Sequence, residues 1–223
     1  MSLTEIVTPY LPGLLSGFLM TLWLSAAVIL VSTPLALLLA LLRDSHNFWL
    51  RLPATVYVTI FRMVPALIVL FFAFYALPQL GLRLRPVTAA ILGMVAVGAA
   101  YMSEDIRGGL QAIDRGQWKA ARALGLSHAH TLRRIILPQA LPLVVPPYMT
   151  RAIIMMKGTS LASMVAVGDL TAEAVRASSI TYQPFIFIIL AGAVYLAISA
   201  ALVIFQHWAE ARLKPAPMAR RRV

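Results

Sequence analysis

The sequence predicts an all-α integral membrane protein with about five transmembrane helices. Two observations support this fold class. First, 61% of the 223 residues are hydrophobic and only 12% are charged, whereas soluble domains are about half apolar and a quarter charged. Second, the apolar residues fall into long segments, and because a span needs about 20 of them, about five spans fit. The chain has no cysteine, which excludes disulfides, thiolate metal sites and cysteine nucleophiles.

The first predicted span covers residues 13–42 and follows a short N-terminal segment, residues 1–12. It is uncharged, and at about 1.5 Å per residue it exceeds the ~30 Å hydrocarbon core of a bilayer. We therefore expect it to be tilted or bent near Pro34. The first basic residue of the chain is Arg43. A cleavable signal peptide carries basic residues ahead of its apolar core, so this segment is predicted to be a retained transmembrane helix.

Four further apolar segments complete the predicted single transmembrane domain, residues 13–208. The second of the five spans is preceded by a mixed apolar and polar entry, and the third is rich in glycine and alanine, which suits closely packed membrane helices. We do not expect the fourth to form one regular helix, because it is interrupted by Pro142, Pro146, Pro147 and Gly158. The predicted ranges of these spans are 57–78, 87–103, 140–167 and 184–208.

The distribution of lysine and arginine predicts the orientation of the chain. With five spans, one side of the membrane carries 13 of the 19 basic residues, in segments 43–53, 104–139 and 209–223. The other side carries three, and three lie within spans. Basic loops stay in the cytoplasm, so we predict an external N-terminus and a cytoplasmic C-terminus, with tail 209–223 on anionic lipid. The net charge of +11 then follows from this bias and predicts no nucleic-acid partner.

The longest cytoplasmic connection, residues 104–139, is predicted to contain two short helices. Asp114 is a plausible N-cap of the first helix, and Gly125 fits the left-handed position that ends many helices. Ser127 is expected to cap a second helix that ends at Pro138. Each helix has an apolar stripe and a basic remainder. Such a pair could lie on anionic lipid, pack against the protein's own spans, or dock into a groove on a partner.

This connection also resembles a known motif. The spacing matches the EAA loop of ABC importer permeases, E-A-A-x3-G-x9-I-x-L-P, through Lys119, Ala120, Ala121, Gly125, Ile135, Leu137 and Pro138. The stretches "GQWKAARALGLS", "LPQAL", "VTIFRMVPAL" and "KGTSL" resemble, in order, motifs of the polar amino acid permeases, the histidine/glutamine/glutamate/arginine/opine group. The resemblance extends from about residue 21 to residue 204. The chain departs from the pattern at Lys119, where the family has glutamate, and at Thr150 and Arg151, where many relatives have Asn-Glu.

The resemblance implies a permease subunit that imports a polar amino acid or derivative across the cytoplasmic membrane of a bacterium. It implies three kinds of partner: an ABC ATPase homodimer, a second permease copy or related subunit, and a periplasmic or surface amino-acid-binding protein. The chain has no GxxxxGK[ST] phosphate loop. It is therefore predicted to be neither an enzyme nor a cofactor binder, with ATP and Mg held by the partner ATPase.

A substrate pathway is predicted around the interrupted fourth span, because cations at membrane depth are costly and face cavities or partners. Its cations would attract the carboxylate of an amino acid, and its hydroxyls would add hydrogen bonds. The candidates are Thr150, Arg151, Lys157, Thr159 and Ser160. Alternatively, Arg151 and Lys157 pair with Asp169, Glu173 or lipid phosphate. Neither the histidines nor the methionines have a spacing that predicts a metal site.

Other functional classes remain as alternatives. A small membrane channel, or a membrane protein anchored on the lipid surface without an ATPase partner, would also be apolar and basic. A membrane enzyme would need converging acids, bases or metal ligands, and the chain has only eight acidic residues. Glu104 and Asp105 suit a salt-bridge network with Arg107 at the start of the 104–139 connection better than catalysis. The permease interpretation accounts for the most features.

Overall fold

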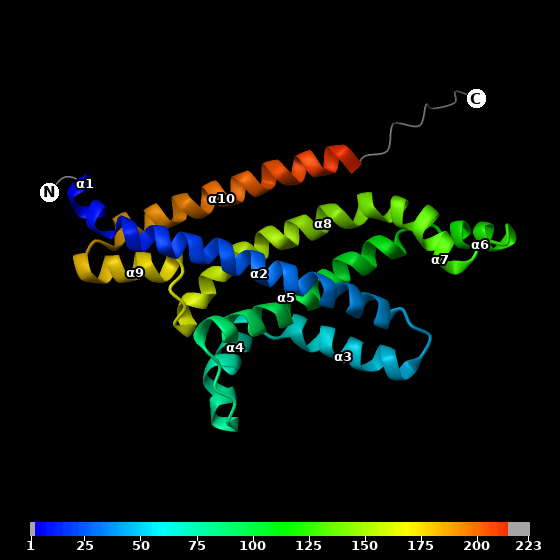
Figure 1. The fold of residues 1–223 in the computed structure, drawn as a ribbon, viewed down its shortest axis with the longest axis horizontal. Coiled ribbons are helices and arrows are strands. Elements are labelled where there is room, and N and C mark those ends of the chain that lie inside the picture. The colour runs from blue at the N-terminus through cyan, green and yellow to red at the C-terminus, as the bar shows by residue number, and fades with distance from the viewer. Residues whose placement is uncertain (1–2, 214–223) are drawn as a thin grey trace.

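In the computed structural model, which describes residues 3–213, every regular element is helical. Four long helices form an elongated bundle (Figure 1). The central helix α5 packs against α2 and α8, and α10 covers α8 and α9. Most of the buried apolar side chains lie between α2 and α5 and their neighbours. The four helices are α2 (Leu11–Arg43), α5 (Pro86–Gln111), α8 (Leu137–Gly158) and α10 (Pro184–Leu213).

The N-terminal residues belong to the first long helix. Helix α1 (Leu3–Val7) and a 3-10 turn (Thr8–Tyr10) lead directly into α2, so the helical stretch covers 41 residues, Leu3–Arg43. That residues 1–12 form an external segment stays a prediction; the structure shows that its described residues are helical and continuous with α2. Apolar residues such as Leu3, Ile6 and Val7 continue the span toward the N-terminus.

The second predicted span is a broken helix. Helix α3 (Phe48–Met63) ends at Val64, and α4 (Ala66–Phe71) begins after Pro65. Val64 has an extended backbone, φ −86° and ψ 132°, because the residue before a proline is disfavoured in the helical region. The two parts meet at 107°. A π-helical turn (Phe72–Ala76) and a 3-10 turn (Leu77–Leu80) prolong α4, and this arm stands out from the side of the bundle (Figure 1).

Helix α9 (Leu170–Thr181) occupies the connection that was expected to be an external loop at 168–183. The side chain of Asp169 accepts a hydrogen bond from the Ala172 amide at 2.9 Å and caps this helix. Thr21 Oγ1 of α2 accepts from the Leu170 amide at 3.1 Å. At the same place, a Cβ on Gly17 would lie 2.8 Å from the Asp169 carbonyl oxygen. Glycine thus lets α9 pack directly on α2.

The last two turns of α5 were predicted to be part of a cytoplasmic loop. The predicted span 87–103 stops before Glu104, yet the helix runs from Pro86 to Gln111. Glu104 pairs with Arg107 and Asp105 pairs with Arg151 of α8, so the helix continues through these charged residues. The fourth predicted span differs as well. Helix α8 is continuous from Leu137 to Gly158 despite its internal prolines, followed by a 3-10 turn (Thr159–Val165). Packing against α5 and α10 compensates for the missing backbone hydrogen bonds.

The number of membrane spans agrees with the sequence-based expectation. Among the described residues, three helical stretches are long and apolar enough to cross a membrane, namely Leu3–Arg43, Pro86–Gln111 and Pro184–Leu213. Two bent helix pairs raise the number to five when each counts as one span: Phe48–Met63 with Ala66–Leu80, and His128–Val165 with Leu170–Thr181. The predicted lipid-binding tail lies mostly outside the described residues, since α10 ends at Leu213.

Two short helices cap one end of the molecule, α6 (Arg115–Ala123) and α7 (His128–Thr131). Figure 1 shows them beyond the ends of α2 and α3, at the opposite end from α1 and α9. A π-helical turn (Leu132–Ile136) joins α7 to α8 without an interruption of the helical path. We call residues 114–138 the coupling unit. It has the helix, glycine turn and helix that its sequence predicts.

Candidate functional site

The coupling unit is shaped by a glycine turn. Gly125 has a left-handed backbone, φ +71°. Its N–H donates to the Arg122 carbonyl at 3.0 Å, and the next N–H, of Leu126, donates to the Ala121 carbonyl at 3.1 Å. These two bonds form the Schellman ending of α6. No atom lies within 4 Å of a Cβ placed on Gly125, so the backbone angle, and not crowding, requires glycine here.

Both helices of the unit start at side-chain caps. Asp114 Oδ1 accepts from the Gly116 amide at 2.7 Å and begins α6. Ser127 Oγ accepts from the His130 amide at 3.3 Å and begins α7. Each cap satisfies an amide that the helix itself leaves unpaired. The two predicted caps are therefore present, and the unit has a defined backbone from residue 114 onward.

Aromatic and apolar contacts fix the unit to the bundle. The ring of Trp118 on α6 stacks on His128 of α7, with centroids 5.0 Å apart and planes inclined by 28°. Trp118 also packs against a small buried cluster of Ile113, Ile136 and Ala140, at the facing ends of α5 and α8. Trp118 thus links α6 to a cluster that includes the first turn of α8.

The motif residues of the coupling unit fall into buried and exposed groups. Ala121 is buried and Ile135 half-buried, so these two hold the unit together. Leu137 is 38% exposed, and the outward-facing members are Lys119, Ala120, Gly125 and Pro138. The expectation that Pro138 ends the second helix is wrong, since Pro138 lies in the first turn of α8. The wide π-helical turn before it leaves room for the proline ring.

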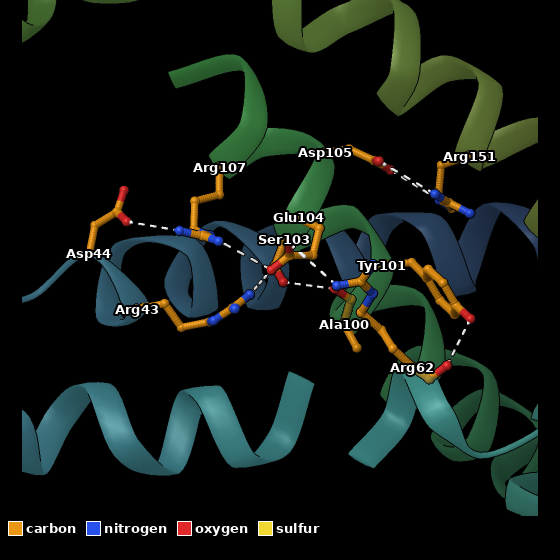
Figure 2. Close-up of polar contacts among 10 residues, drawn as sticks. All are labelled: Arg43, Asp44, Arg62, Ala100, Tyr101, Ser103, Glu104, Asp105, Arg107 and Arg151. Carbon is orange, nitrogen blue, oxygen red and sulfur yellow. Dashed lines mark hydrogen bonds and ion pairs between the residues drawn. The ribbon is translucent and has the colours of Figure 1, made fainter. Parts of the chain in front are cut away.

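A network of charged side chains lies where α2, α3 and α5 meet (Figure 2). Its centre is Glu104 of α5, which pairs with Arg43 at the end of α2 and lies 3.4 Å from Arg62 of α3. Arg107, one turn further along α5, is 3.7 Å from Glu104 and 3.6 Å from Asp44. The predicted pairing of Glu104 with Arg107 is thus confirmed and extends to the ends of two other helices, whereas Asp105, predicted to join the same network, pairs with Arg151 instead.

The neighbouring carboxylate joins α5 to α8. Arg151 donates from Nε to Asp105 Oδ2 at 3.0 Å and from Nη2 to Oδ1 at 3.4 Å. The same guanidinium lies over the Tyr101 ring, 4.7 Å from its centroid, and the Tyr101 hydroxyl donates to the Arg62 carbonyl at 3.0 Å. The alternative that Arg151 pairs with Asp169 or Glu173 is wrong: Asp169 caps α9, and Glu173 pairs with Arg176.

Arg151 also borders a cavity of about 280 Å³ between α4, α5 and α8. Its walls are mainly apolar, with Leu70, Met94, Ile154 and Met155 among them, and two glycines, Gly98 and Gly158, also line it. Tyr101 and Arg151 bring the polar groups to this space. An apolar chamber with a few convergent polar groups is the usual form of a small-molecule site.

The other candidate pathway residues do not converge on this cavity. Thr150 accepts a hydrogen bond from Gln206 of α10 at 3.1 Å and donates to the Pro146 carbonyl. Lys157 is exposed, and Thr159 is buried with its hydroxyl donating to the Met156 carbonyl at 2.6 Å. Ser160 accepts from the Ser163 hydroxyl through its own carbonyl. Of the five candidates, Arg151 alone is a lining residue of the cavity among the described residues.

Sequence reasoning missed Tyr101 and Asp105 as partners of Arg151. Both lie on α5, four residues apart, and therefore on one helix face. That signal was present in the sequence, but the predicted span ended at residue 103. No group of three or more histidine, aspartate or glutamate side chains in the described part of the chain could hold a metal ion.

These elements define a class: a helical membrane protein with up to five spans and a capped helix pair at one end. The chain belongs to the family of binding-protein-dependent transport system inner membrane components, whose model matches residues 32–215. Members of this family are ABC importer permeases of the bacterial inner membrane. They work with an ATPase and a substrate-binding protein, and they are not enzymes themselves.

Several proteins are similar to this chain over nearly its whole length. The octopine transport system permease protein OccM of Rhizobium meliloti is 38% identical over 221 residues, covering 92% of this chain and 90% of the relative. The probable amino-acid ABC transporter permease protein YckA of Bacillus subtilis (strain 168) is 33% identical over 204 residues, with the same coverage. The crystal structure of an amino acid ABC transporter with histidines matches at a TM-score of 0.89 and 31% identity, covering 95% of this chain and 99% of that chain.

Proposed function

We propose that this permease subunit imports an amino acid or an amino acid derivative and is driven by ATP hydrolysis on a partner. The substrate class is supported by the relatives, whose names refer to amino acids or octopine. The cavity supports the same substrate class, because it can hold a small molecule and is bordered by the guanidinium of Arg151. The observation that carries the proposal is the capped coupling unit at one end of the bundle.

The coupling unit is proposed to be the docking element for the ATPase. Its exposed residues are available to a partner, while Trp118 ties it to the buried cluster at the ends of α5 and α8. ATP and Mg would be held by two copies of the ATPase, whose closure would press on α6. Because α6 contacts the cluster at the start of α8, the movement would reach the cavity beside Arg151.

The proposed assembly contains a second permease subunit, either another copy or a related chain, and an external binding protein that delivers the substrate. The orientation follows the distribution of basic residues, with α6 and α7 in the cytoplasm and α9 outside. Substrate would then enter from the α9 end and leave near the coupling unit, because these lie at opposite ends of the bundle (Figure 1).

The pathway is proposed to include the cavity bordered by Arg151. A free carboxylate entering this space would compete with Asp105 for the guanidinium, whose two hydrogen bonds to Asp105 are 3.0 and 3.4 Å long. Tyr101 would keep the guanidinium in place by its ring. Every α-amino acid carries such a carboxylate, so this contact would serve the class and not one member.

The test is affinity purification from native membranes in mild detergent, followed by mass spectrometry and transport assays in proteoliposomes. We expect an ABC ATPase to co-purify, and uptake of one member of a panel of amino acids and opines to require ATP and the binding protein. Leu137→Asp should release the ATPase, whereas the membrane-inserted amount should stay the same. Purification of the permease without an ATPase, under conditions that preserve a control ABC importer, would reject the proposed docking role.

A further inference from the structure

The coupling unit carries positive charge that this chain does not balance. Residues 115–168 contain no aspartate or glutamate. Within the described range, residues 3–213, the basic side chains of the unit form no ion pair. The basic side chains concerned are Arg115, Lys119, Arg122, Arg133 and Arg134. All five are exposed.

Three of these cations share one face of α6. Arg115, Lys119 and Arg122 are spaced by four and three residues, so they lie one above another along the helix. They border a hollow of about 780 Å³ between α6 and the ends of α2 and α5. The remaining lining is partly apolar and includes Leu110, Ile113, Trp118, Leu132 and Ile136. The hollow therefore combines a cationic wall with an apolar floor.

The carboxylates nearest to this wall are already occupied. Asp44 is the single acidic residue among those that line the hollow. Its Oδ1 accepts from Gln111 Nε2 at 3.1 Å and lies 3.6 Å from Arg107. Asp114 uses its Oδ1 to cap α6. Among the described residues, neither carboxylate forms an ion pair with the three cations of α6.

A partner that covers this face must therefore bring the missing negative charge. Removing water from a cation is costly unless a carboxylate replaces the lost hydration. We propose that the ATPase partner presents aspartate or glutamate side chains into the hollow, with Lys119 as the central contact between Arg115 and Arg122. This inference rests on the proposed function, and it adds the chemistry of the partner's docking groove.

Position along the molecule favours a protein over lipid as the source of the carboxylates. Helices α6 and α7 extend past the ends of α2 and α3, so the cations of α6 lie at the end of the molecule opposite to α1 and α9 (Figure 1). Leu124, 77% exposed at the turn after α6, adds an apolar contact at the same end. An acidic groove with an apolar patch complements both features.

The experiment is zero-length carbodiimide cross-linking of the permease–ATPase complex in nanodiscs of zwitterionic lipid. This reagent joins a lysine amine to a carboxylate in contact with it. The chain has three lysines, at 119, 157 and 214, so a cross-linked peptide identifies its site directly. We expect an amide bond between Lys119 and an aspartate or glutamate of the ATPase. Lys119→Arg should abolish this cross-link while the ATPase still binds, because the charge is kept and the amine is lost.

Binding measurements supply the second readout. Lys119→Glu combined with Arg115→Glu should weaken ATPase binding at least tenfold. The matched control is Arg51→Glu, an exposed cation of α3 outside both the coupling unit and the hollow, and it should change binding by less than twofold. Replacing the contacting carboxylate of the ATPase by lysine should restore binding to the doubly substituted permease. Higher salt should weaken the wild-type complex as well.

Two results would overturn the inference and leave the proposed function in place. One is normal binding by the Arg115→Glu, Lys119→Glu variant while Leu137→Asp still releases the ATPase. The other is dependence on Lys119 only in nanodiscs with anionic lipid, with no cross-link to the ATPase, which would assign the hollow to lipid headgroups. Failure of the wild-type permease to retain any ATPase would instead reject the proposed function.

Discussion

Gly125 sets the angle between α6 and α7 through its left-handed backbone, and Arg151 sets the polarity of the cavity 26 residues further along the chain. The first role was predictable, because helix caps and glycine turns depend on residues within a few positions of each other. The second was predictable only in part. Arg151 and Asp105 are 46 residues apart, and no local pattern relates them.

Gly125→Pro should uncouple ATP hydrolysis from transport. Proline fixes φ near −65°, which is incompatible with the φ of +71° at this position. We expect at least a tenfold loss of ATP-driven uptake in proteoliposomes, with an unchanged amount of permease in the membrane. Gly125→Ala should have a smaller effect, since a left-handed L-residue costs about 1–2 kcal/mol.

Gly108→Ala is the control for this substitution. Gly108 lies within α5, and no atom lies within 4 Å of a Cβ placed there. The Gly108→Ala variant should therefore transport substrate at the wild-type rate. Normal uptake by Gly125→Pro would show that the turn geometry does not matter for coupling.

Arg151→Ala and Lys157→Ala should differ in their effect on uptake. Arg151 borders the cavity, and its loss leaves the Asp105 side chain, 13% exposed, without its ion-pair partner. We expect several-fold or greater loss of uptake for Arg151→Ala and less than a twofold change for the exposed Lys157. Both are measured as initial rates over a range of substrate concentrations.

The double variant Arg151→Gln with Asp105→Asn separates transport from folding in this experiment. It removes both charges and keeps groups of similar size, so no carboxylate is left unpaired. Its thermal stability should lie near the wild-type value while its uptake stays low. Recovery of full uptake would assign Arg151 a structural role only.

At the scale of elements, the sequence predicted where helices occur better than where they end. The predicted spans stopped at charged residues, because apolar content was the signal used. Helix α5 passes through Glu104, Asp105 and Arg107 since each is paired. Helix α9 was missed because its composition is mixed and its stability comes from packing on α2 and α10. Both differences arise from contacts between elements, which a linear pattern does not contain.

Glu104→Gln should loosen the meeting point of α2, α3 and α5. It removes the charge that holds three arginines together, namely Arg43, Arg62 and Arg107. Leaving a buried polar group without its partner costs about 1–3 kcal/mol, and we expect a cost toward the lower end because this network is only partly buried. We expect a lower midpoint of thermal unfolding in detergent for Glu104→Gln.

Glu210→Gln is the comparison for this variant. Glu210 lies near the end of α10, and its carboxylate oxygens contact Gln206 and His207 of the same helix. Its neutralisation should leave the midpoint nearly unchanged. Equal midpoints for Glu104→Gln and the wild type would show that the network adds no net stability.

At the scale of the whole molecule, the number of spans and the position of the coupling unit were predictable, but their arrangement was not. Hydropathy shows that a segment is apolar, and it does not show that the chain turns by 107° at Val64 and Pro65. The order of packing around α5 depends on which glycines and alanines permit close contact, and this information is spread over several helices.

Cysteines introduced one at a time should show which end of the protein faces the cytoplasm, because the natural chain contains no cysteine that would also be labelled. Ala123→Cys places a thiol on the exposed surface of α6, and Ser179→Cys places one on α9. A membrane-impermeant maleimide added to intact spheroplasts should label Ser179→Cys only, and after lysis it should label both. Labelling of Ala123→Cys in intact spheroplasts would reverse the predicted topology.

The three prolines of α8 have a mechanical consequence. Each removes one backbone hydrogen bond, and Pro142, Pro146 and Pro147 all lie between the coupling unit and Arg151. The 22-residue helix is about 33 Å long, and it bends most easily at the prolines partway along it. When the first turns of α8 are displaced, bending at the prolines changes the angle between the two parts of the helix. Motion of α6 and α7 would reach the cavity as a rotation of the Arg151 segment, with little sliding of the helix along its axis.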